Sequence, residues 1–424
     1  MTEPFIKQPR RFFDLSRAGS PGRLSAALLM AGVVLICFCL DRRAANQAAL
    51  AMLAATVIFM WGSGPSILKN FPGRKLNLAW ALWILAGCAS LMGALDIDYS
   101  LKAIRHDLLS PIILFYAAAL LLFDERQVKI IWGAVLIGSL LLACSGIVNY
   151  VAMAQETPEG VLGSFGRIRT FGLEEVVHFY ILRLFLSFPL WALAIYRAKD
   201  KTRRLLLMAG AAVVLTGWLL SYGRAQLLLL PLLPFLFLLV GRARPRQLNA
   251  FVATSLILSL GAVAYITLGD CILNRDDFGI RQFLWKVSAN RIQENPWQGI
   301  GFGHVAYERL DVSQYLAGTC EQYLEQHHPH NLFLNIWLTT GLPGLLAMFC
   351  LVGMIYLTVL PAALNREAGN PVARDWARAF LISLILTTFI NMSDWLLTTN
   401  NLDLLALMAG GAVASARMRR RAVH

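Results

Sequence analysis

Residues 24–40 read LSAALLMAGVVLICFCL, an apolar run without a single charged side chain. A transmembrane helix needs roughly 20 mostly apolar residues to cross a hydrocarbon core of about 30 Å. Residues 224–241, RAQLLLLPLLPFLFLLVG, continue in the same way behind one arginine. The chain of 424 residues is 57% hydrophobic and 15% charged, which leaves too little polar surface for a soluble globule. The sequence therefore predicts an all-α, polytopic membrane protein.

Twelve spans are expected along the chain. Their ranges are 24–40, 44–62, 76–95, 107–123, 128–152, 174–197, 203–221, 224–241, 247–268, 343–361, 376–392 and 397–416. An even number of spans places both termini on one side of the membrane.

The distribution of basic residues indicates which side that is. The segments assigned to the side of the termini carry 25 of the 38 Lys and Arg residues, including five within 1–23 and four in the tail Arg417–Arg421. Basic segments stay in the cytoplasm, so we expect both termini there. The net charge of +13 then follows from topology and from attraction to anionic lipid, and we expect no nucleic-acid partner. The first span lacks a small-residue cleavage site, so we expect it to be retained.

This topology divides the chain into three regions. Residues 1–268 hold spans one to nine, residues 269–342 form a large periplasmic loop with short helices, and residues 343–424 hold the last three spans. Within the loop, residues 281–292 have the pattern of an amphipathic helix, and Asp276-Asp277 before it suits a loop. Gly299-Ile-Gly301-Phe-Gly303 lacks the flanking strand and Lys-Ser/Thr of phosphate-binding loops, so we interpret it as a flexible turn.

The cysteines indicate no zinc site. Five of the seven lie in apolar spans, where cysteine behaves as a small hydrophobic residue. Cys271 and Cys320 both lie in the large outer loop, where an oxidising periplasm would allow a disulfide bridge between them.

The run His328-Pro329-His330-Asn331 lies where the polar loop meets the tenth span. Histidine, with an ordinary pKa of about 6.5, can accept a proton at neutral pH, and ionisable groups at a membrane surface are candidates for function. Pro329 suits the first position of a helix and Gly341 the position just past its end. Such a helix is too short to span the membrane, so it should be re-entrant or lie at the surface. His330 would lie in its first turn, where free N–H groups favour an anionic substrate.

Several arginines accompany this histidine at the outer ends of the spans. Arg224 begins the eighth span, Arg281 lies in the large loop, and Arg167 and Arg169 lie in an earlier outer loop rich in glycine. Guanidinium groups and one imidazole could together hold a diphosphate and deprotonate a hydroxyl.

Structural roles are the alternatives for two arginines. Arg183, inside the sixth span, could pair with Glu174 or Glu175, and Arg224 could be neutralised by Asp394 or Asp403.

These elements together resemble the O-antigen ligases, within the superfamily of O-antigen ligases and polymerases. His330-Asn331, nine residues and then Gly341-x-x-Gly344 match the family's motif, although Leu345 replaces a residue that is often small. Arg224-x-x-x-Leu228, Arg281-x-x-x-Trp285 before Pro296-x-x-Gly299-x-Gly301, and Arg169-x-x-Gly172 match further elements. The motifs run from about residue 169 to 361, and the span layout extends the likeness over the whole chain.

The resemblance implies a membrane-embedded glycosyltransferase of the GT-C type, with its active site facing the periplasm of the bacterial inner membrane. The donor would be O-antigen polysaccharide on undecaprenyl pyrophosphate, and the acceptor the core sugar of lipid A. The resemblance implies neither a metal nor another cofactor, and we expect a monomer.

The same resemblance assigns roles to single residues. His330 would be the general base, and Arg224 and Arg281 would bind the pyrophosphate leaving group. In-line attack at the anomeric carbon would invert the linkage. Arg169 and Arg167 are further candidates for substrate binding. His328 and Asn331 would orient His330 or the acceptor.

Other functions compete with this interpretation. Asp96-Ile-Asp98 has the spacing of a cation-binding pair, as a metal-dependent transferase would need, although a solvated turn also explains it. An O-antigen polymerase or a protein O-glycosyltransferase would use a similar donor. A transporter or flippase would share the twelve-span layout, but the charged groups here gather at one face and the two halves do not match.

Overall fold

The computed structural model describes residues 21–40, 42–63, 71–122, 124–157, 170, 177–221, 275–303, 306–307, 310, 329–364, 371–392 and 399–423. Within these ranges every regular element is helical. The helices are α1 (Pro21–Cys39), α2 (Arg42–Ser63), α3 (Arg74–Ala89), η2 (Ser90–Gly93), α4 (Ile97–Ala103), η3 (Ile104–Leu109), α5 (Ser110–Leu121), α6 (Glu125–Gln155), α8 (Val177–Arg197), α9 (Lys201–Leu219), α13 (Arg275–Glu294), α14 (Leu332–Leu364), α15 (Pro371–Ile390) and α16 (Thr399–Val423).

The helices confirm the prediction of an all-α, multi-pass membrane protein. Seven helical segments in the described part are long and apolar enough to cross a membrane. Ten of the twelve predicted ranges overlap described helices, whereas 224–241 and 247–268 lie outside the described residues. The number of twelve spans therefore stays a prediction.

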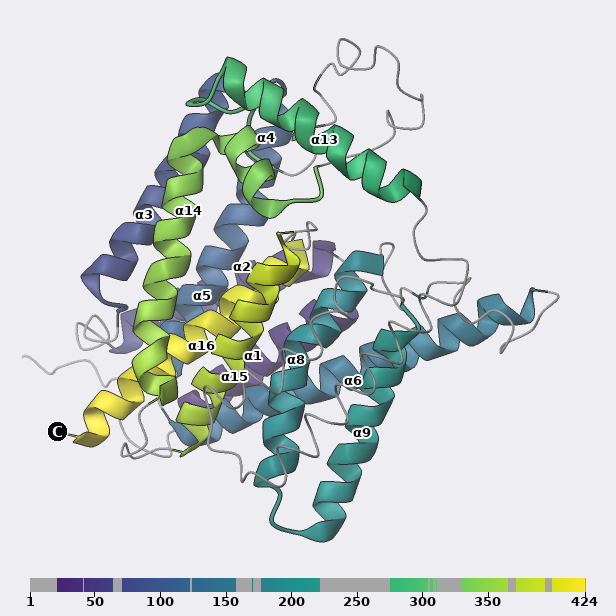
Figure 1. Cartoon of the computed structure of the whole chain (residues 1–424). Coiled ribbons are helices and arrows are strands. Elements are labelled where there is room, and N and C mark those ends of the chain that lie inside the picture. The colour runs from purple at the N-terminus through teal and green to yellow at the C-terminus, as the bar shows by residue number, and fades with distance from the viewer. Residues whose placement is uncertain are drawn as a thin grey trace, which may run out of the picture.

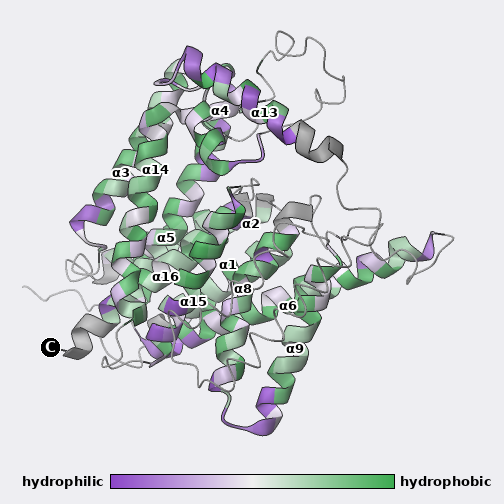
Figure 2. Cartoon of the chain, viewed as in Figure 1, coloured by the Kyte–Doolittle hydropathy of each residue, from purple (hydrophilic) through white to green (hydrophobic). Residues whose placement is uncertain are grey.

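Hydrophilic residues gather at two opposite ends of the bundle. Figure 2 shows one such end at α13 and the other at the connection between α8 and α9, with an apolar body between them. This connection lies in a segment that we assigned to the cytoplasm, and α13 in the predicted periplasmic loop. The two segments lie at opposite ends, as that assignment requires.

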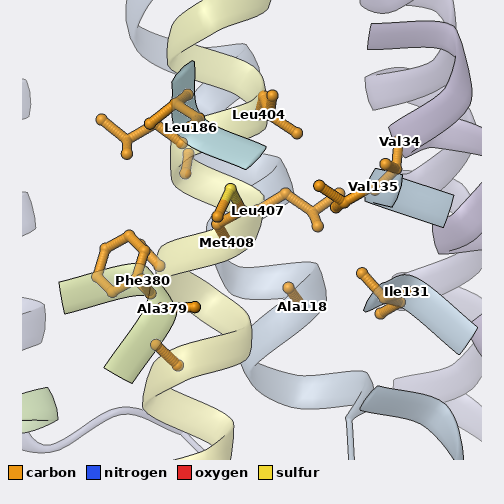
Figure 3. Packing of buried hydrophobic residues seen from close by; sticks show 14 of the residues in the cluster. Val34, Ala118, Ile131, Val135, Leu186, Ala379, Phe380, Leu404, Leu407 and Met408 are labelled. Atoms are coloured by element: carbon orange, nitrogen blue, oxygen red, sulfur yellow. The ribbon is translucent and has the colours of Figure 1, made fainter. Parts of the chain in front are cut away.

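The core of the bundle lies where α1, α5, α6, α8, α15 and α16 meet. Figure 3 shows Leu407 and Met408 of α16 in the middle of this cluster, with side chains of the other helices around them. Small residues allow the close approach, since a Cβ on Gly410 would overlap the backbone carbonyl of Phe115 on α5. The hydrophobic effect does not drive helices together inside a bilayer. Close packing of small residues stabilises the bundle instead.

Buried polar groups also join three of these helices. The guanidinium of Arg183 on α8 is 1% exposed and donates to the side chain of Asn401 on α16 and to the carbonyl of Phe38 on α1, both at 3.3 Å. Asp403 is also buried on α16. The charges of Asp403 and Arg183 both act on the thiol of Cys37. Arg183 thus holds contacts to α1 and α16. The partners expected from the sequence, Glu174 or Glu175, lie outside the described residues.

A candidate active site at the head of α14

The first element of the site is a short helix at the head of α14. Gly341, with φ 70° and ψ 179°, interrupts the helical backbone, so residues 332–340 form one helix and residues 342–364 another. The predicted break at Gly341 is confirmed. Nine residues make a helix of about 14 Å, too short to span the membrane.

The start of this helix corrects one prediction. Its first residue is Leu332 rather than Pro329, because the side chain of Asn331 caps it: Oδ1 accepts a hydrogen bond from the backbone N–H of Leu334 at 3.0 Å. His330 therefore precedes the cap and does not lie in the first turn. The hydrogen bond from the Leu334 amide to the Asn331 side chain thus determines where the helix starts, and Pro329 does not.

The end of α15 holds the same helix start. The backbone N–H of Leu332 donates to the carbonyl of Asn391 at 2.9 Å, and Nδ2 of Asn331 donates to the carbonyl of Met392 at 2.8 Å. The amides of Leu332 and Leu334 are therefore bonded within the protein. This corrects the expectation that the N–H groups of the first turn are free to hold an anion.

The glycine-rich turn at residues 299–303 packs against the other end of the short helix. The carbonyls of Leu338 and Thr339 accept hydrogen bonds from Ile300 at 3.0 Å and Gly301 at 3.1 Å. Gly299, Gly301 and Gly303 all have positive φ, and a Cβ on Gly299 would overlap the carbonyl of Thr339. The turn is buried and hydrogen-bonded, so its glycines serve close backbone approach and the interpretation as a merely flexible turn was incomplete.

The second glycine of the Gly-x-x-Gly element has a steric role. A Cβ on Gly344 would overlap the side chain of Thr340, which bonds back to the carbonyl of Ile336 at 2.7 Å. Leu345, the departure from the family's pattern, is 8% exposed and packs with Leu332 and Met348. The element therefore shapes the junction between the short helix and the span.

The amphipathic helix α13 lies across the bundle at the end where α14 begins (Figure 1). It begins at Arg275, earlier than predicted, so Asp276-Asp277 falls in a helix and not in a loop. The indole N–H of Trp285 donates to the carbonyl of Pro329 at 2.7 Å. Arg281, half-buried, lies one helical turn before Trp285 on the same face of α13. This contact brings the segment of Arg281 next to the segment of His330.

His330 itself has an unusual backbone. Its φ of 49° makes it the one residue other than glycine with positive φ in the described part of the chain. Such a conformation costs on the order of 1–3 kcal/mol and persists only where neighbouring contacts enforce it. The imidazole is half-buried.

Four other predicted site residues cannot be placed. Arg224, Arg169, Arg167 and His328 lie outside the described residues. The same holds for Cys271 and Cys320, and for Asp394, a suggested partner of Arg224. Of the predicted site, the described part of the structure thus contains His330, Asn331 and Arg281, on segments that contact one another.

Comparison with known proteins finds a match in this part of the chain. Residues 208–349 match the family model described as O-antigen ligase. This matched domain includes α13, the glycine-rich turn and the short helix that begins α14.

Two curated relatives cover a smaller part of the chain. Over 80 residues the chain is 30% identical to the O-antigen ligase of Salmonella typhimurium (strain LT2), which covers 19% of this chain and 20% of the relative. Over 73 residues it is 36% identical to a protein of Rickettsia felis named as a polysaccharide ligase, covering 17% of this chain and 18% of the relative. The matches thus span about a fifth of the length of either relative.

An apolar cavity of about 200 Å³ begins beside the short helix that begins α14. Leu332, Phe333 and Ile336 line one end, and Val352 and Ile355 of the same helix line it farther along. The remaining walls come from α3, η3, α5, α15, α16 and the glycine-rich turn. Asp107, in the π-helical turn η3, is the one ionisable residue among its described lining residues. No sequence pattern indicates this cavity, because its walls come from segments far apart in the chain.

Outside the domain, Asp96 has a structural role. Its carboxylate accepts a hydrogen bond from the backbone N–H of Tyr99 at 2.9 Å and so caps α4, and Asp98 lies in the first turn of that helix. Both positions are favourable for a carboxylate at a helix start. Within the described residues, no group of three or more His, Cys, Asp or Glu side chains is arranged to hold a metal ion.

Proposed function

We propose that this protein is an O-antigen ligase of the bacterial inner membrane, with its active site at the head of α14 facing the periplasm. The enzyme transfers O-antigen polysaccharide from undecaprenyl pyrophosphate to the core sugar of lipid A and works as a monomer. One observation carries the proposal: within a domain that matches the O-antigen ligase family, α13 with Arg281 is hydrogen-bonded to the segment of His330.

The proposed reaction needs a base and a site for a leaving diphosphate. His330 takes the proton of the acceptor hydroxyl while the hydroxyl oxygen forms a bond to the anomeric carbon of the donor. The bond between this carbon and the phosphate oxygen breaks, and undecaprenyl pyrophosphate leaves with the electron pair. In-line attack inverts the anomeric configuration. Arg281 and Arg224 neutralise the charge of the leaving group, with Arg169 and Arg167 as further contacts.

The half-buried position of His330 fits this role. A base that is partly shielded from water, but still reachable, can meet a sugar hydroxyl that enters from the aqueous side. Asn331 in this proposal acts through the backbone, since both ends of its amide already bond within the protein. His328, for which the structure offers no position, remains a candidate for contact with the acceptor.

The apolar cavity supports a substrate with a lipid part. It starts at Leu332, two residues from His330, and its described walls are almost entirely hydrocarbon. A hydrocarbon chain buried there gains about 25 cal/mol per Å² of apolar surface, although part of this is already gained in the bilayer. The cavity would thus contribute to the affinity for a lipid-linked donor and also orient it.

Reconstitution with two defined substrates tests the proposal. The purified protein in proteoliposomes should convert lipid-linked O-antigen and lipid A core into lipopolysaccharide, and it should do so in excess chelator. Elongation of the lipid-linked glycan without added acceptor would instead indicate a polymerase. Transport of the lipid-linked glycan without transfer would indicate a flippase, and loss of transfer in chelator would favour a metal-dependent mechanism.

A further inference from the structure

We propose that Trp285 is a positioning residue, whose indole N–H fixes the backbone of His330 and the place of Arg281 relative to it. The inference rests on the proposed function, in which His330 is the base. It concerns a residue that does not touch the substrate and acts through the peptide bond between Pro329 and His330.

Hydrogen bonds hold His330 from both sides in the chain. Before it, the carbonyl of Pro329 accepts from Trp285 at 2.7 Å, which fixes the orientation of the peptide plane that leads into His330. After it, Asn331 and Leu332 donate to the carbonyls of Met392 and Asn391, which directly follow α15, at 2.8 and 2.9 Å. Between these two fixed points, His330 keeps its φ of 49°. The strained conformation therefore depends on contacts from two different helices.

The same indole determines where Arg281 lies. Arg281 precedes Trp285 by four residues, so both side chains project from one face of α13. Because the bond from Trp285 ends on the residue next to His330, it sets the register between α13 and the loop that carries the imidazole. Without this bond, the peptide plane before His330 would be able to rotate, and the guanidinium of Arg281 would be able to move relative to the imidazole.

The chain offers a matched control at the other end of the short helix. The indole N–H of Trp337 donates to the carbonyl of Pro296 at 3.1 Å, which is also a bond from a half-buried tryptophan to a proline carbonyl. This bond joins the short helix to Pro296, just before the glycine-rich turn, and does not involve the backbone next to His330. A loss of general stability should affect both tryptophan positions, whereas a loss of positioning should affect Trp285 alone.

The experiment compares Trp285→Phe and Trp337→Phe with the wild-type protein in the reconstituted transfer assay. We expect Trp285→Phe to lower kcat by about tenfold to a hundredfold, the size of effect that a small misplacement of a catalytic group produces. The KM values for donor and acceptor should stay within about twofold. Trp337→Phe should leave kcat within about threefold. An equal loss of kcat in both variants, or an unchanged kcat in Trp285→Phe, would overturn the inference.

A second variant covers the case in which Trp285→Phe does not purify in a monodisperse form. Trp285→benzothienylalanine keeps the shape of the ring but replaces the indole N–H by a sulfur that cannot donate to the carbonyl of Pro329. It should lower kcat with little change in KM, and an unchanged kcat would overturn the inference. A wild-type protein without transfer activity would contradict the proposed function. An active wild type together with an equally active Trp285→Phe variant would contradict this inference alone.

Discussion

His330 combines an ionisable ring with a left-handed backbone, and at the residue scale this combination is the most informative feature of the site. The ring was recognisable in the sequence from its place between a polar loop and an apolar span. The backbone conformation was not, because it is enforced by Trp285 and by the carbonyls that follow α15. Observed strain at a candidate catalytic residue is a reason to test that residue first.

Replacing His330 by Asn should separate chemistry from folding. Asparagine tolerates a positive φ better than most residues, so the backbone should be kept while the base is lost. We expect the transfer rate to fall by about 10²- to 10⁴-fold, the contribution of general base catalysis. The unfolding midpoint in detergent should match that of the wild type. Transfer within tenfold of the wild-type rate by a folded His330→Asn variant would rule out His330 as the base.

A methyl group added at Gly341 should destabilise the folded protein. Its φ and ψ are accessible almost only to glycine, and a Cβ would overlap the carbonyl of Trp297. We expect Gly341→Ala to lower the free energy of unfolding by at least about 1–3 kcal/mol. The control is Gly353→Ala in the same helix, where no atom lies within 4 Å of the added Cβ. This control should be neutral or stabilising by up to about 1 kcal/mol, measured by the same denaturation assay.

Among the elements, the short helices and turns contribute more to the position of the candidate site residues than the long spans do. The position of α13, the glycine-rich turn and the first nine residues of α14 brings the candidate groups together. The sequence predicted α13, the end of the short helix at Gly341 and the span that follows, because apolar periodicity, glycine and proline act locally. It missed the true helix start, since the cap Asn331 is also bonded to a segment 61 residues away.

The cavity between α3, α5, α14, α15 and α16 leads to a prediction about the donor. Val352→Trp should fill part of it, because Val352 lines the cavity and is half-buried. We expect the KM for a long-chain lipid-linked donor to rise about tenfold, equivalent to about 1.4 kcal/mol of binding. A donor with a short, water-soluble prenyl chain should be used as well as by the wild type.

Leu346→Trp is the matched control for this prediction. Leu346 lies on the same helix, is 57% exposed and does not line the cavity. Initial rates over a range of donor concentrations give the comparison. An equal rise of KM for the acceptor in Val352→Trp, with the donor unaffected, would show that the cavity serves acyl chains of the acceptor instead.

For the whole molecule, the arrangement of charge determines orientation. The basic connection between α8 and α9 lies at one end of the bundle and the polar helix α13 at the other (Figure 2). Since basic segments stay in the cytoplasm, α13 and the head of α14 should face the periplasm. The candidate site would then be open to substrates in the outer leaflet of the inner membrane.

Reporter fusions test this orientation. A periplasmic phosphatase fused after residue 310 should be active, whereas the same enzyme fused after residue 200 or at the C-terminus should be inactive. A fluorescent protein that folds only in the cytoplasm should give the opposite pattern. Phosphatase activity at residue 200 together with inactivity at residue 310 would invert the topology and place the candidate site on the wrong side for the proposed donor.

Local sequence patterns were sufficient to predict the all-helical membrane fold, the approximate helix positions and the break at Gly341 after His330. These depend on local properties, namely the hydropathy of neighbouring residues and the backbone freedom of glycine. Only the tertiary structure decided how the site is held: Trp285 meets Pro329 across 44 residues and Asn331 meets Met392 across 61. Such contacts end on backbone carbonyls, which every residue has. No side-chain pattern therefore indicates them, and the packing of the helices selects which carbonyl each donor reaches.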